Sequence, residues 1–458
     1  MNKKLSRQNS LDHDLLDYQP QKWRINLPFR DYQLRLEDLI PALAGSIGKI
    51  SLVAAFAMAW ATGFGIRDPR FITENVRLEI ILGSIFTLLF CAVLNPTAGP
   101  PGTLAPLIPL IPMMVSAGVH PLPFAILISV MGFVFAWKGF FQKIVDINGP
   151  GTKAGILLLF GIMGITSSLQ KLQAWTSSSA RQELFFVLII LGFILYIILR
   201  RLNFKWLIIP AITVLALTVS VLFGMVPVFS TQIGLPVIDP AYWWQQQWGI
   251  GFGLSVKNFI AAIPFAMLVM TMWPIDALAV KTLQENSYPP AAKNAVLDMN
   301  ATFLVVALRN LAGAVLGGAQ TAAVWRSFMI PLAVVKRPIG GSALFLGIIG
   351  IAFGVLGFPI DISVFPPLVW LVLIFGVFLP LLEVGLGTIR KVSATPIALT
   401  CIVLGISVNP VIGWSTALLV ENFNLLKSKK ATRILSSADK ILTVAILLVS
   451  VIAYWFIL

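Results

Sequence analysis

Long apolar runs separated by short polar stretches fill the chain from residue 39 onward. Runs of about 17 residues or more occur at residues 42–65, 77–95, 121–138, 153–169, 184–199, 206–227, 257–280, 297–317, 341–358, 364–388 and 439–458. They predict membrane-spanning helices, because a hydrocarbon core about 30 Å thick requires about 20 apolar residues. The first 38 residues are polar and charged, so we expect them to form a cytoplasmic segment and not a signal peptide.

Three further stretches do not fit one helix each. Residues 96–115 and 319–333 are too broken or too short to span as simple helices. Residues 394–425 are too long, because one helix of that length would reach about 48 Å. Pro410 interrupts the centre of this last run, in "SVNPVIG", so we predict two short helices there.

These segments predict an all-α polytopic membrane protein with a seven-plus-seven inverted repeat. We expect a first repeat at residues 39–227, an extracytoplasmic loop at 228–256 and a second repeat at 257–426. Residues 427–458 would be a basic linker followed by an extra apolar helix.

The two broken stretches are the third segment of the first repeat and the tenth segment of the chain. Paired interruptions at corresponding places in two halves indicate a transporter site built from discontinuous helices. "NPTAGPPGTLAPLIPLIP" (95–112) contains six prolines, which favour an extended entry and a short half-helix. Non-helical backbone at membrane depth is tolerated where protein buries it or where it lines a cavity. The alternative is an ordinary span kinked by proline.

Basic residues indicate the orientation. With the N-terminus inside, most of the 33 Lys and Arg residues fall at cytoplasmic positions, and the outside stretch 228–253 has none. Joining residues 394–425 into one pass would instead place the basic "KSKKATR" cluster outside. The distribution therefore predicts a cytoplasmic N-terminus and an extra helix that crosses the membrane.

Composition excludes several other classes of function. The chain is 58% hydrophobic and 11% charged, so its net charge of +14 indicates membrane topology and not nucleic-acid binding. Two cysteines and two histidines predict neither a disulfide framework nor a metal site. We find no phosphate-binding loop and no catalytic constellation, so we expect no cofactor and no enzymatic activity.

Four patches resemble the sulfate permease (SulP) anion transporters. "LGGAQTAAVWRS" (316–327) looks like that family's Gly-Gly, small-residue and Ser-Arg-Ser passage, and it follows an acid-bearing helix. "DLIPALAGSIGKISLVAAFAMAW" (38–60) looks like its first helix, and "IALTCIVLGISVNPVIGWSTALLVENF" looks like its last two short spans. The uracil and xanthine permeases share the fold that this resemblance implies, with a core domain that moves against a gate domain.

The chain also departs from the family pattern. Phe56 stands where SulP proteins usually have glutamine, and the family's eighth-helix glutamate falls at or one residue from Asp276. A basic linker and one apolar run stand where the soluble STAS domain usually follows. We therefore expect a divergent bacterial relative that lacks the STAS domain.

Arg326 and Asp276 are the main candidates for chemistry. Arg326 would open the tenth half-helix, where free N–H groups and the helix dipole favour an anion. No acidic residue lies within fifteen positions of it, so we expect an unpaired guanidinium that contacts the substrate, or alternatively a structural pair with Asp276. Asp276 would carry a coupling proton, or alternatively face water near Lys281.

Other residues complete the expected site. Lys49 would neutralise charge in the cavity or snorkel from its helix, and Arg309 is expected to be a structural or interfacial arginine. Hydrogen-bonding groups and aromatic residues would line the cavity as well. They are Ser327, Thr321, Gln320, Gly102, Thr103, Thr97 and Asn95, with Phe56 and Trp273 shaping the cavity.

These observations predict a secondary transporter of a small anion, such as sulfate, molybdate, bicarbonate or a carboxylate, with proton or sodium coupling left open. A proton-coupled nucleobase or aromatic carboxylate carrier is the alternative within transport, and an anion channel is the alternative from another class. We expect a multi-pass location in the bacterial inner membrane, with the lipid bilayer and a small anion as partners. The sequence leaves open whether the chain forms a homodimer.

Overall fold

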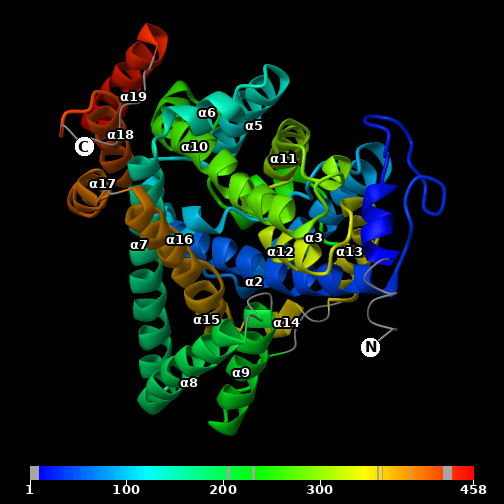
Figure 1. Cartoon of the computed structure of the whole chain (residues 1–458). Helices are drawn as coiled ribbons and strands as arrows, with labels where there is room; N and C mark the ends of the chain where they lie inside the picture. Colours follow the sequence, from blue (N-terminus) through cyan, green and yellow to red (C-terminus); the bar gives the residue numbers. More distant parts are fainter. Residues whose placement is uncertain are drawn as a thin grey trace.

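The computed structural model describes residues 10–202, 204, 207–228, 233–357, 360–363, 365–392, 395–426 and 436–457. Helices dominate these residues (Figure 1). Eight of them are long and apolar enough to cross a membrane, and four shorter apolar helices accompany them. The predicted all-α polytopic fold is confirmed.

One group of packed helices, here called the core group, takes four segments from each half of the chain. From the first half come α2 (Leu39–Phe64), α3 (Pro69–Phe86) with π-helical η2 (Thr87–Leu94), 3-10 helix η3 (Ala105–Leu110) with α4 (Ile111–Ser116), and α5 (Pro121–Trp137). From the second half come α10 (Val256–Ser287), α11 (Met299–Val315), α12 (Arg326–Val334) and α13 (Ile339–Leu356). The pairs α5 with α11, α3 with α13 and α2 with α12 pack together, so the two halves interlock.

The remaining helices form a second group, here called the gate group. It contains α7 (Pro150–Ser178), α8 (Gln182–Arg201), α9 (Ile208–Leu222), α15 (Pro366–Leu371), π-helical η7 (Val372–Phe378), α16 (Leu379–Val392), α17 (Thr395–Ser407) and α18 (Pro410–Asn422). Three shorter elements connect the groups: α6 (Phe141–Ile147), η5 (Tyr242–Gln247) and α14 (Ile360–Ser363). Two others lie at the core group: η1 (Leu36–Asp38) precedes α2, and η6 (Lys293–Ala295) lies between α10 and α11. Figure 1 shows α2 between α7–α9 on one side and α12 and α13 on the other.

The predicted break in residues 394–425 is present. Helix α17 ends at Ser407 and α18 begins at Pro410, with the Asn409 side chain accepting a hydrogen bond from Val411 N at 2.8 Å. The two short helices pack tightly, because a Cβ on Gly413 would overlap the Gly405 backbone. The extra helix α19 (Ser437–Ile457) then packs on α18 and α10. Most of the basic linker before it lies outside the described residues.

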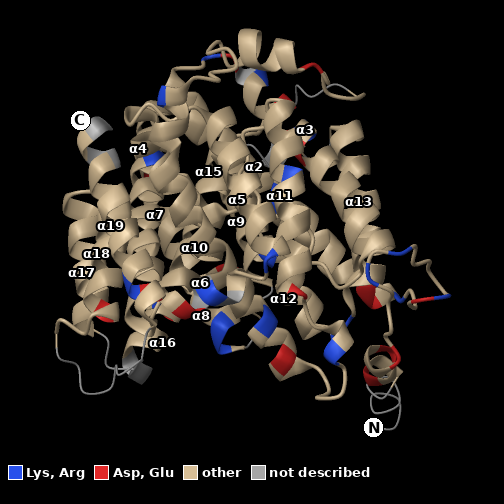
Figure 2. Cartoon of the chain, turned by 90° about the horizontal axis from the view of Figure 1, so that it is seen from above, with Lys and Arg blue, Asp and Glu red and all other residues tan. Residues whose placement is uncertain are grey.

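The N-terminal residues 10–38 are fixed to one end of the core group. Arg337, in the turn between α12 and α13, is fully buried and donates to Asp38 at 2.9 Å and to Asp14 at 2.6 Å. Tyr18 Oη donates to Pro96 O at 2.8 Å. Figure 2 shows charged residues gathered mainly at the two ends of the bundle, with many at the end that carries this N-terminal segment.

Candidate functional site

Two extended stretches cross inside the core group, one ahead of η3 and one ahead of α12. Their backbones pair antiparallel through three hydrogen bonds: Gly102 N to Ala323 O at 2.7 Å, Leu104 N to Thr321 O at 2.9 Å and Trp325 N to Pro100 O at 3.0 Å. The crossing needs a glycine, because a Cβ on Gly102 would overlap the Trp325 backbone. The pairing satisfies backbone groups that have no helix to satisfy them at membrane depth.

Side chains from α3 and α11 hold the second extended stretch. Asn310 exchanges two hydrogen bonds with Ala322, and Asn75 does the same with the backbone around Gly317 and Ala319. Glu79 accepts from Gln320 N at 3.2 Å and forms a fully buried ion pair with Arg309. Arg309 therefore has the structural role that we expected, because it fixes the acid that holds the chain leading to α12.

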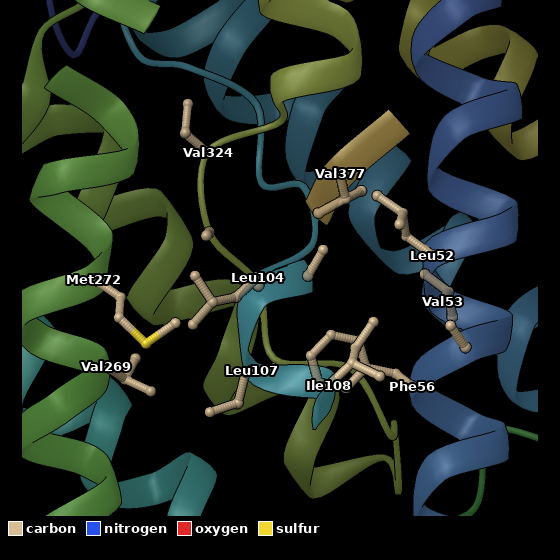
Figure 3. Packing of buried hydrophobic residues seen from close by; sticks show 14 of the residues in the cluster. Leu52, Val53, Phe56, Leu104, Leu107, Ile108, Val269, Met272, Val324 and Val377 are labelled. Carbon is tan, nitrogen blue, oxygen red and sulfur yellow. The ribbon is translucent and has the colours of Figure 1, made fainter. Parts of the chain in front are cut away.

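The leading residues of segment three are packed between α2 and α10. Figure 3 shows Leu104, Leu107 and Ile108 between Phe56 of α2 and Val269 of α10. All five side chains are buried. Hydrophobic burial therefore fixes the first half-helix although its prolines prevent a regular α-helix.

Arg326 is the first residue of α12, as predicted, and it is not alone. Its Nη1 lies 2.8 Å from Asp276 Oδ1, with side-chain exposures of 26% for the arginine and 8% for the aspartate. The expectation of an unpaired guanidinium is therefore wrong. The two residues are fifty positions apart in sequence, and only the packing of α10 against α12 brings them together.

Asp276 lies in a continuous helix. Helix α10 passes through Pro274 without ending, and its aspartate is only 9% exposed. The alternative of a water-facing aspartate beside Lys281 therefore does not hold in this structure.

Lys49 is buried next to the crossing. Its Nζ donates to Pro101 O at 3.0 Å and lies 4.1 Å from the centroid of the Trp325 ring. The side chain is 1% exposed, so it does not snorkel toward an interface. A carbonyl and an indole face are uncharged partners, so the positive charge of a protonated Lys49 is not cancelled by them.

A cavity of about 250 Å³ lies between the core group and the gate group. Five of the predicted site residues line it: Lys49, Thr103, Asp276, Arg326 and Ser327. Thr103 Oγ1 donates to Gln320 Oε1 at 2.9 Å, and Ser327 Oγ accepts from Trp325 Nε1 at 3.1 Å. The geometry thus brings two positive side chains and the start of α12 to one cavity.

The other predicted residues lie away from the cavity lining. Gln320 supports Thr103 from behind and also donates to Gly102 O at 3.0 Å. Thr97 donates to Asn95 Oδ1 at 2.7 Å, and Thr321 contributes its carbonyl to the crossing. Phe56 and Trp273 do not shape the cavity, because both are fully buried in side-chain packing, Trp273 stacked on Phe303.

The gate-group part of the lining was not anticipated, and it contains three polar residues. Tyr196 Oη donates to Glu383 Oε1 at 2.6 Å, and Arg200 forms an ion pair with the same carboxylate. The available signal was Glu383, an acid within the apolar run 364–388. Arg200 lies in the last turn of α8, where a basic residue also fits membrane topology and gives no separate signal. In the described residues no group of three metal-binding side chains comes together.

Two solved structures with a similar fold are anion transporters of low sequence identity. The transmembrane domain of a cyanobacterium bicarbonate transporter, BicA, aligns with a TM-score of 0.55 at 14% identity, covering 86% of this chain and 100% of that one. The murine Solute Carrier 26 family member A9 anion transporter, in its inward-facing state, aligns with a TM-score of 0.54 at 11% identity, covering 86% of this chain and 69% of that one. The predicted seven-plus-seven inverted repeat is thus confirmed at the level of the fold.

Sequence comparison leads to a family whose description names no activity. No curated protein sequence matches the chain. A family described as "Protein of unknown function (DUF3360)" matches residues 2–457. Because the match covers nearly the whole chain, this membrane protein belongs to the DUF3360 family.

Proposed function

We propose that the chain is a secondary transporter of small anions in which the core group moves against the gate group. The observation that carries this proposal is Arg326, which begins a half-helix at a cavity that both groups line. An anion there would meet a guanidinium, the N-terminal end of a helix and Lys49 together. The two similar structures are an anion transporter and a bicarbonate transporter, and this supports the same proposal.

The cavity also suggests an orientation. Arg200, at the cavity edge, has a side chain 48% exposed, whereas Asp276 has one 8% exposed. Arg200 ends α8, and the following helix α9 contributes its first turn to the same wall. With the positive-inside orientation, this end of the cavity faces the cytoplasm, as in an inward-open carrier of a bacterial inner membrane.

Asp276 has a place in the proposed cycle. An anion that binds Arg326 shares the guanidinium with Asp276. The carboxylate keeps its partner and its charge, and it holds the guanidinium in place at the start of α12.

Transport in liposomes tests the proposal. The full chain is reconstituted and loaded with an unlabelled anion, and uptake of the labelled anion is followed with and without a proton gradient. We expect saturable counterflow that Arg326→Ala abolishes, with Lys257→Ala, which removes an exposed charge outside the cavity, as the matched control. Flux without counterflow would indicate a channel, and no anion flux in folded protein would refute the proposal.

A further inference from the structure

The charges that line the cavity nearly cancel. Among its described lining residues, three are basic and two are acidic: Lys49, Arg200, Arg326, Asp276 and Glu383. Each carboxylate lies in an ion pair with one of the arginines. A bound anion would give Lys49 the negative partner that it lacks, so the occupied cavity carries one positive charge, on Lys49, that no acidic side chain neutralises.

A single uncompensated charge sets a limit on what can bind. A monovalent anion makes the occupied cavity neutral, whereas a divalent anion leaves a net negative charge. Inside a protein this excess is costly, because charges a few ångströms apart interact several times more strongly there than in water. A strongly hydrated dianion also needs many hydrogen-bond donors to replace its water.

Few donors are free to replace that water. Thr103 donates to Gln320, and Tyr196 donates to Glu383, so both hydroxyl hydrogens already have acceptors. Ser327 is the third hydroxyl on the lining. Its Oγ donates to Gly45 O at 3.4 Å, so the hydroxyl groups leave few donors for a hydrated dianion.

The rest of the wall is apolar. Its members come from both groups: Ala44, Leu52, Ala105, Pro106, Leu283, Trp325, Ile330 and Pro331 from the core group, and Ile208, Ile209, Pro210, Gly376, Val377 and Pro380 from the gate group. Small-molecule sites commonly combine such a wall with a few convergent polar groups. The cavity volume of about 250 Å³ lies just below the range of about 300–1,000 Å³ for drug-sized ligands.

We propose that the substrate is a monovalent organic carboxylate with a short apolar body. Its carboxylate binds between Arg326 and Lys49, and its apolar body contacts Ile209 and Val377 of the gate group. This inference rests on the proposed anion transport and narrows it to one class of anion. Inorganic dianions such as sulfate are poor substrates of this cavity.

A series of carboxylates of increasing chain length tests the proposed contacts of the apolar body. Acetate, butyrate, hexanoate and benzoate are compared with sulfate and succinate at equal ionic strength, by thermal stabilisation of the purified full chain and by competition in liposomes. We expect each added methylene to tighten binding roughly fourfold until the cavity is full. Val377→Thr, which keeps the side-chain shape, should weaken hexanoate several-fold more than acetate.

A variant that changes the charge of the cavity tests the proposed preference for monovalent anions. Glu383→Gln adds one positive charge to the cavity, so we expect the ratio of sulfate affinity to hexanoate affinity to rise at least tenfold. Glu285→Gln makes the same change at an exposed position outside the cavity and should leave the ratio unchanged. If sulfate binds as tightly as hexanoate and chain length has no effect, this inference is overturned while anion transport stands. If no anion of either kind binds the folded protein, the proposed function itself fails.

Discussion

Single residues decide the chemistry of the cavity, and the pairing of Arg326 with Asp276 changes how the arginine must be tested. Removing one partner of a buried ion pair leaves the other uncompensated, which costs about 3–5 kcal/mol in well-buried cases. Loss of function in Arg326→Ala alone would therefore mix binding with folding. A second variant that also neutralises Asp276 separates the two effects.

We predict that Arg326→Ala lowers the Tm and that Arg326→Ala with Asp276→Asn restores it, because the double variant leaves no unpaired carboxylate. Neither variant should be stabilised by added anion. Thermal unfolding with and without hexanoate provides the measurement. Anion-induced stabilisation in the double variant would show that the pair is structural and that the anion binds elsewhere.

For Lys49 we predict that removing the charge does not lower the stability, in contrast to Arg326→Ala. A buried ammonium without an acidic partner carries a desolvation penalty of several kcal/mol, which its contacts with Pro101 O and Trp325 offset only in part. Lys49→Met fills the same space without the charge. We expect an unchanged or higher Tm together with at least tenfold weaker anion binding, measured on the same preparation. A clear loss of stability would mean that the ammonium is mainly structural.

At the scale of elements, the broken third and tenth segments were predictable and the direction of side chains was not. Pro100, Pro101 and the short run before Arg326 exclude regular helices whatever surrounds them. By contrast, nothing in one sequence says which face of a helix meets a cavity. Phe56 and Trp273 lie on apolar helices buried on most sides, so their periodicity did not distinguish packing from lining. Asp276 and Arg326 meet only through tertiary packing.

The crossing of the two half-helices gives a prediction at this scale. Gly102→Ala places a Cβ against the Trp325 backbone, which cannot move without shifting the start of α12. We expect a loss of at least about 2 kcal/mol of stability, in the range known for overpacking, and loss of anion binding. Gly387→Ala is the matched control, because a Cβ there meets no atom within 4 Å. Equal Tm values for the two variants would contradict the tight crossing.

The N-terminal segment is a second element with a measurable role. Arg337 joins Asp14 and Asp38 to the turn between α12 and α13, and its side chain is fully buried. Arg337→Ala leaves a buried Asp38 carboxylate unpaired, so we expect a loss of about 3–5 kcal/mol and faster proteolysis within residues 10–38. Lys336→Ala removes a half-buried neighbour with a single ion pair and should have a much smaller effect.

At the scale of the whole molecule, the cavity between the two groups implies a direction of access that can be measured. Cys91 and Cys401 are both buried, so a cysteine introduced at the cavity edge is the main target for a membrane-impermeant maleimide. We predict that Arg200→Cys is labelled in inside-out vesicles and protected in right-side-out vesicles, because Arg200 ends α8 at the side of the cavity that we propose faces the cytoplasm. A saturating transported anion should slow the labelling, since it occupies the space beside this position and favours the closed arrangement of the two groups. Labelling only from the opposite side would reverse the orientation, and labelling from both sides without an effect of anion would contradict movement of the core group against the gate group.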